Sequence, residues 1–131
     1  MFFETDIPDS YHDCVTNVPT ERNAYINFVN NAAIVISTNG FGGLLPWKMA
    51  EYFQLGKCIV SEQLSHTALQ PIIPDVHLKV FHDYDNCIEV IRELLDHKNE
   101  VNEIGRGGKK YFKEFILPGP ALKSLIKDAF S

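Results

Sequence analysis

The sequence lacks the features that mark several large classes of protein. Its 131 residues contain no apolar run near the roughly 20 residues of a membrane-spanning helix. The acidic first residues also have no basic segment of the kind that opens a signal peptide. Acidic residues outnumber basic ones by 17 to 12, whereas nucleic-acid binders usually carry a basic field. We therefore expect no membrane span and no nucleic-acid partner.

Cysteine is scarce, and neither it nor histidine is placed as a metal site requires. Cys14, Cys58 and Cys87 are odd in number and far apart, which favours reduced thiols in a cytoplasmic protein over a disulfide framework. No closely spaced cysteine pair exists, and the five histidines do not share metal-ligand spacing. We expect a cytoplasmic protein with no metal and no bound cofactor.

The motifs of common nucleotide and hydrolase sites are also missing. There is no GxxxxGK[ST] loop and no GxSxG nucleophile turn. The segment GFGG at 40–43 comes near the dinucleotide fingerprint GxGxxG without completing it. A small dehydrogenase-like cofactor domain is therefore the weaker alternative.

Buried strands and amphipathic helices are present instead. Residues 32–37 and 57–61 are short β-branched apolar runs, typical of strands buried on both faces, and a helical segment separates them. Pro46 and Gly56 mark the start and end of that helix. A strand, helix and strand in this order predict a parallel βαβ unit. Further elements are predicted as a strand at 77–81 and helices after Thr20, at 85–97, at 99–116 (interrupted by three glycines) and at about 120–130.

The predicted fold class is α/β, with a small parallel Rossmann-like sheet of three to four strands flanked by helices. Residues 1–3 could add a short strand. We expect one domain over residues 1–131, since 45% hydrophobic residues are enough for a packed core.

The turn at 38–43 is the candidate binding site. It follows the first buried strand and precedes a helix, and the start of a helix favours an anion such as phosphate. Its glycines would let a ligand approach the backbone, a lysine could offset phosphate charge, and a glutamate could bind sugar hydroxyls. Steric need alone also explains glycines at such turns, and the two charges could be solvated. The predicted binding residues are Asn39, Gly40, Gly42, Gly43, Lys48 and Glu51.

The stretch GFGGLLPWKMAEYFQLGKCIVSE, residues 40–62, resembles the donor-side motif of group 1 glycosyltransferases with the GT-B fold. Bacterial members that make surface polysaccharides have a similar glycine-rich turn and a similar helix. The resemblance implies a partial GT-B C-terminal domain. It also implies binding of a nucleotide-diphosphate sugar for transfer to a polysaccharide or glycan acceptor, with Glu51 contacting the nucleotide ribose.

The chain also departs from that family. The N-terminal acceptor domain and the first part of the donor domain have no counterpart here, and Gly43 stands where the family has the first of two glutamates. The resemblance therefore implies no catalytic residue in this chain. We expect a chain that is incomplete for catalysis alone: a domain fragment, a partial reading frame, or one subunit of a split enzyme whose N-terminal domain is a separate subunit.

A second interpretation makes the chain a non-catalytic, self-associating α/β interaction module. A buried-type strand at the edge of so small a sheet needs cover. Another copy of the chain could supply it, so we expect a homodimer.

Overall fold

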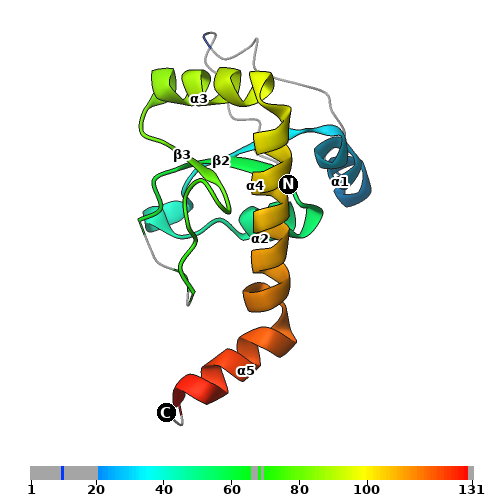
Figure 1. The fold of residues 1–131 in the computed structure, drawn as a ribbon, viewed down its shortest axis with the longest axis vertical. Helices are drawn as coiled ribbons and strands as arrows, with labels where there is room; N and C mark the ends of the chain where they lie inside the picture. Colours follow the sequence, from blue (N-terminus) through cyan, green and yellow to red (C-terminus); the bar gives the residue numbers. More distant parts are fainter. Residues whose placement is uncertain (1–9, 11–20, 66–67, 69, 130–131) are drawn as a thin grey trace.

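The computed structural model describes residues 10, 21–65, 68 and 70–129. Figure 1 shows an α/β fold in which helices surround a small sheet, as the sequence predicts. The elements are α1 (Arg22–Asn31), β1 (Ile34–Ser37), a 3-10 turn (Phe41–Gly43), α2 (Trp47–Leu55), β2 (Cys58–Glu62), β3 (Lys79–Phe81), α3 (Tyr84–Asp96), α4 (Lys98–Tyr111), a π-helical turn (Phe112–Ile116) and α5 (Pro118–Ala129).

The sheet has three parallel strands in the order β1-β2-β3 within the described residues. Helix α2 makes the predicted βαβ crossover between β1 and β2. The connection at 63–78 joins β2 to β3, and the residues described in it form no helix. The predicted strands and helices are present with boundaries shifted by one to two residues. The suggested strand at 1–3 and the Thr20 helix start lie outside the described residues.

Alternating strand side chains build a hydrophobic core on each face of the sheet. On one face, Val35 and Ile59 pack with Phe53 of α2. On the other face, a second cluster joins the sheet to α3 and α4; it contains Cys58, Val60, Phe81, Leu94 and Ile104. Cys58 is 1% exposed and therefore a core residue, as its position in an apolar run predicts, and this burial raises the pKa of its thiol to about 11.

Helix α4 crosses the amino-terminal ends of the strands, and its glycines make that crossing possible (Figure 1). A Cβ at Gly105 would overlap the Gly56 carbonyl, just before β2, and one at Gly107 would overlap the Val76 carbonyl, just before β3. A Cβ at Gly108 would lie 2.6 Å from the Phe53 ring. The predicted interruption of this helix is therefore wrong, because the glycines are contact positions within a continuous α4.

Tyr111, at the end of α4, holds the long connection between β2 and β3. Its hydroxyl donates to the Gln70 carbonyl at 2.6 Å, and its ring lies 4.8 Å from that of His77. The Nδ1 atom of His77 in turn accepts from the Ile73 N–H at 3.0 Å. A segment without a helix of its own is thus fixed against α4 by side-chain contacts.

Helix α5 lies beyond the end of α4, at the lower end of Figure 1. The expected helix at about 120–130 runs from Pro118 to Ala129, so the predicted Pro-Gly-Pro break is also a helix start. No helix among the described residues is long and apolar enough to cross a membrane.

The glycine contacts of α4 predict a strong difference between two alanine substitutions. Gly107→Ala should lower the free energy of unfolding by about 1–3 kcal/mol, because the Cβ meets backbone that cannot easily move. Arg106→Ala is the matched control, since Arg106 is exposed on the same helix; it should change the free energy of unfolding by less than about 0.5 kcal/mol. Urea unfolding followed by circular dichroism measures both. A Gly107→Ala protein as stable as the wild type would contradict this packing.

Candidate functional site

The loop between β1 and α2 is shaped by the same glycines that the sequence singles out. Gly42 and Gly43 have φ values of 67° and 78°, in the left-handed region where other residues are strained. Gly40 has a different reason, since a Cβ there would lie 3.0 Å from the Leu44 carbonyl oxygen. The steric explanation for these glycines therefore applies at all three positions, whether or not the loop binds a ligand.

Glu62, at the end of β2, ties this loop to the neighbouring strand. Its Oε2 atom accepts from the Asn39 backbone N–H at 2.7 Å, and the Asn39 side-chain amide donates to the Gln63 carbonyl at 3.0 Å. The Oδ1 atom of Asn39 is buried and has no partner among the described residues. The sequence analysis did not predict this role of Glu62. A carboxylate at the end of a buried strand could have indicated it, because such a group needs a hydrogen-bond donor nearby.

Some backbone N–H groups of the loop make hydrogen bonds to carbonyl groups of the same loop. Gly40 donates to the Leu44 carbonyl at 2.7 Å, and Gly43 to the Gly40 carbonyl at 2.9 Å. Helix α2 starts after Pro46 without a side-chain cap. The N–H groups of Trp47 and Lys48 lie in its first turn, where helix geometry supplies no acceptor. The electropositive part of the loop is therefore the start of α2.

A hollow of about 570 Å³ lies beside the loop and the start of α2. It is at the carboxyl ends of the strands, where open parallel sheets bind their ligands. Lys48 is the one Lys or Arg among its lining residues. The lining consists of Ile36, Ser37, Thr38, Asn39, Gly40, Phe41, Leu44, Leu45, Pro46, Trp47, Lys48 and Tyr52.

The two charged residues predicted for the site lie on the side of α2 that faces α1. The Lys48 ammonium is 5.7 Å from the centre of the Tyr25 ring, and Lys48 also lines the hollow. Glu51 Oε1 accepts from Arg22 of α1 at 2.8 Å, and the Glu51 side chain is 15% exposed. Its Oε2 atom is buried without a partner in the described part of the chain. Glu51 is thus next to the hollow but outside its lining.

A hydrogen-bonded pair of tyrosines joins α1 to α2. The Tyr25 hydroxyl donates to the Tyr52 hydroxyl at 3.1 Å. Burial and this hydrogen bond raise the pKa of Tyr25 far above its usual value, so Tyr25 stays a neutral donor. Tyr52 also lines the hollow, and α1 is therefore connected to the candidate site through two side chains of α2.

The structure brings together only some of the predicted residues. Asn39, Gly40 and Lys48 line the hollow, and the other two predicted glycines, Gly42 and Gly43, shape the loop without lining it. Glu51 faces Arg22. The exposed aromatic rings of Trp47 and Phe41 join the lining, although sequence reasoning did not place them in the site.

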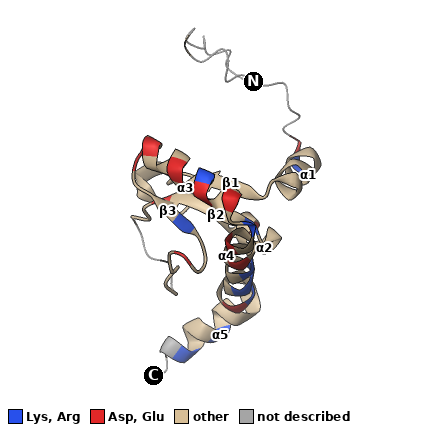
Figure 2. Ribbon diagram, turned by 45° about the horizontal axis from the view of Figure 1, so that its top comes forward, with Lys and Arg blue, Asp and Glu red and all other residues tan. Residues whose placement is uncertain are grey.

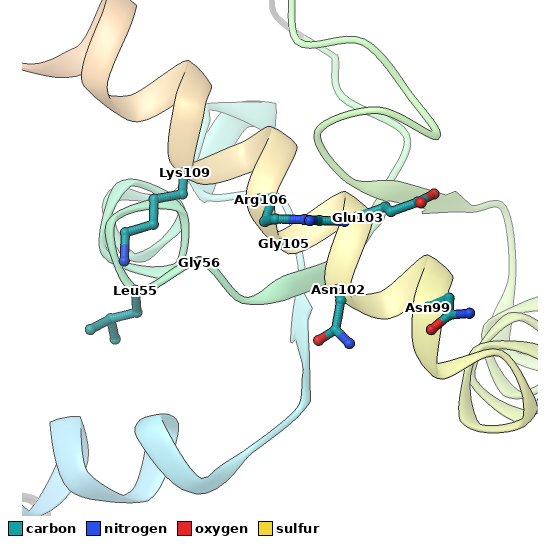
Figure 3. Close-up of a pocket in the computed structure, with 8 residues that line it drawn as sticks. All are labelled: Leu55, Gly56, Asn99, Asn102, Glu103, Gly105, Arg106 and Lys109. Atoms are coloured by element: carbon teal, nitrogen blue, oxygen red, sulfur yellow. The ribbon is translucent and has the colours of Figure 1, made fainter.

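A second hollow, of about 540 Å³, lies at the opposite, amino-terminal edge of the sheet. Figure 3 shows polar side chains of α4 around it, next to the end of α2. Its lining comprises Leu55, Gly56, Asn99, Asn102, Glu103, Gly105, Arg106 and Lys109. The polar side chains are exposed, and parallel sheets bind ligands at the other edge. The hollow beside the loop is therefore the better candidate.

No group of three His, Cys, Asp or Glu residues that could hold a metal ion occurs among the described residues. No protein-family model, no curated protein and no solved structure matches this chain. The candidate site therefore has to be judged on its own geometry.

The tie between Glu62 and the loop predicts a graded loss of stability. Glu62→Ala should cost about 1.5–3 kcal/mol, because it removes a charged acceptor from a part-buried N–H. Glu62→Gln keeps a neutral acceptor and should cost roughly half as much. Glu93→Ala, at an exposed position on α3, is the control and should change stability by less than about 0.5 kcal/mol. Urea unfolding separates the three, and equal stabilities would show that Glu62 does not hold the loop.

Proposed function

We propose that this chain is the donor-binding part of a glycosyltransferase that uses a nucleotide-diphosphate sugar. The observation that carries the proposal is the hollow at the carboxyl end of β1, bounded by the uncapped start of α2 and by Lys48. The resemblance of residues 40–62 to the donor-side motif of such enzymes is a separate argument from the residues themselves.

The diphosphate would lie against the first turn of α2. A helix start presents N–H groups and a partial positive charge to an anion, worth about 0.3–1 kcal/mol at an exposed site. Lys48 adds a full positive charge beside the same turn. Between Arg22 and Lys48 the sequence contains no Asp or Glu, so no carboxylate of the loop itself would repel the phosphates.

The base or the sugar ring would contact the aromatic side chains of the loop. The Trp47 side chain is 68% exposed and Phe41 is 98% exposed, and both line the hollow. Aromatic faces suit the stacking of a nucleobase, worth about 1–3 kcal/mol per base in proteins that bind single strands. Leu44, between them in the sequence, is 58% exposed and also lines the hollow, and contiguous exposed apolar patches often mark binding sites.

Glu51 would reach a ribose hydroxyl only by changing partners. Its Oε1 atom is paired with Arg22, and its Oε2 atom is buried without a partner among the described residues. A ribose would therefore compete with Arg22 for the carboxylate. Because Arg22 is 70% exposed in its side chain, releasing it into water is inexpensive.

Transfer of the sugar would also require protein on the other side of the hollow, where the acceptor binds. The residues around the hollow supply binding groups, and we assign none of them a catalytic role. An open hollow can neither exclude water nor position an acceptor. We therefore propose that the acceptor side comes from another domain or from a separate subunit.

Nucleotide binding by the isolated chain tests the proposal. UDP, GDP or a UDP-sugar at about 100 times its Kd should stabilise the fold by about 2.7 kcal/mol, seen as a rise in Tm. Lys48→Ala should weaken that binding, while Lys123→Ala on α5, an exposed lysine outside the hollow, should not. If no nucleotide raises the Tm, the proposal is wrong.

The competition at Glu51 gives a separate test. If ribose displaces Arg22, Glu51→Ala should raise the nucleotide Kd about tenfold, which corresponds to 1.4 kcal/mol. Arg22→Ala should leave the Kd unchanged or lower it, because a competitor has been removed. Titration calorimetry of the two variants decides the point. Equal effects of both substitutions would mean that Glu51 only joins α1 to α2.

A further inference from the structure

The two outer strands of the sheet, β1 and β3, differ in the charge of their surroundings. At the β3 edge, Lys79 pairs with Asp75 at 2.9 Å and with Glu100 at 2.6 Å, and Asp83 stands two residues after the strand. Charged side chains on an edge strand discourage pairing with another strand. The β1 edge has no such protection, because no Asp, Glu, Lys or Arg occurs between Arg22 and Lys48. Figure 2 shows charged residues along α3 and α4, with others on β3 and α5.

The β1 strand is also uncovered on one face. Its side chains Val35 and Ser37 are buried, whereas Ile36, on the opposite face, is 52% exposed. The helices that cover this face, α3 and α4, pack over β2 and β3. Within the described residues, β1 pairs with β2 alone. A β-branched strand with a half-exposed isoleucine and a free ladder edge is suited to pairing with another strand.

We propose that the free edge of β1 pairs with the β1 strand of a second copy of this chain. A two-fold axis perpendicular to the sheet makes such a pair antiparallel and self-complementary, and it joins the two sheets into one. Antiparallel self-pairing places the flank before β1 next to the flank after β1 of the other copy, so it requires that these two flanks do not repel. They are 32–33 and 38–39, and they read Ala-Ala and Thr-Asn. The charges bonded to them are of opposite sign, since the Lys57 ammonium donates to the Ala32 carbonyl at 2.9 Å and the Glu62 carboxylate accepts from the Asn39 N–H at 2.7 Å.

The register follows from the alternation of side chains. Directly opposite residues of an antiparallel pair lie on the same face of a sheet. A two-fold axis perpendicular to the sheet leaves every residue on its own face, so the residue nearest the axis must lie opposite its own copy. Placing the axis at Ile36 sets Ile36 opposite Ile36 of the partner subunit, on the face that α3 and α4 leave open. Two half-exposed isoleucines then cover each other.

This inference goes beyond the proposed function and does not depend on it. The pairing uses the backbone edge of β1 and the Ile36 side chain, which also lines the hollow, whereas the phosphates of a nucleotide would bind at the start of α2. The mass measurements are therefore made without nucleotide. A chain that binds no nucleotide would still dimerise, and a monomer could still bind nucleotide. Nucleotide titrations and measurements of mass therefore fail or succeed separately.

Light scattering coupled to size exclusion tests the proposal over a range of protein concentrations. The wild type should change from monomer to dimer as concentration rises. Ile36→Lys places two ammonium groups opposite each other at the axis and should raise the dimer Kd by roughly tenfold or more. The matched control is Leu95→Lys, because Leu95 is 59% exposed on α3, away from this edge; it should leave the dimer Kd unchanged.

Hydrogen exchange of the wild type gives a second measurement that needs no variant. Amides of residues 34–37 should exchange more slowly as concentration rises, while those of α5 should not change. A wild type that stays monomeric overturns the proposal. So does a dimer that Ile36→Lys leaves intact, or one whose concentration-dependent protection lies on α5.

Discussion

The close approach of α4 to the amino-terminal ends of the strands is the constraint on which the rest of this fold depends. Gly105 and Gly107 allow the helix backbone to meet the backbone before β2 and β3. Through this contact α4 presents Ile104 to one core and, at its end, Tyr111 to the other. A single helix therefore connects both faces of a sheet that has three strands in the described part and an apolar cluster on each face, and parallel sheets need both faces covered.

Helix α4 contacts the amino-terminal ends of β2 and β3, and the loop between β1 and α2 lies at the opposite, carboxyl ends of the strands. Glu62 fixes Asn39 there, and the loop glycines set its shape. The result is a rigid loop beside a hollow, which is the arrangement expected of a binding site on a rigid scaffold. The proposed donor site and the proposed dimer edge both lie on this uncharged part of the chain, between Arg22 and Lys48.

Local signals explain which parts of the fold could be predicted from the sequence. The strands around the loop are short apolar runs, and Pro46 and Gly56 limit α2, so their positions were predictable. The range of α4 was predicted as well, but its continuity was not, because three glycines argue against an unbroken helix unless their contacts with distant residues are known. In the site, Asn39, Gly40 and Lys48 do line the hollow. The direction of Glu51 depends on where α1 packs, and no local pattern contains that information.

The attachment of α1 has a dynamic consequence. Val29 is its one buried residue. Its described polar attachments are the links from Arg22 and Tyr25 to α2, the Lys48 ammonium beside the Tyr25 ring, and the Lys57 ammonium on the Asn30 carbonyl. Such an element opens at a free energy well below that of global unfolding. A subglobal opening of this helix would leave the three-stranded sheet intact while releasing the Glu51 carboxylate and wetting the Tyr52 hydroxyl. The native ensemble would then contain a minor state in which the surroundings of the hollow are more polar and wider than in the closed form.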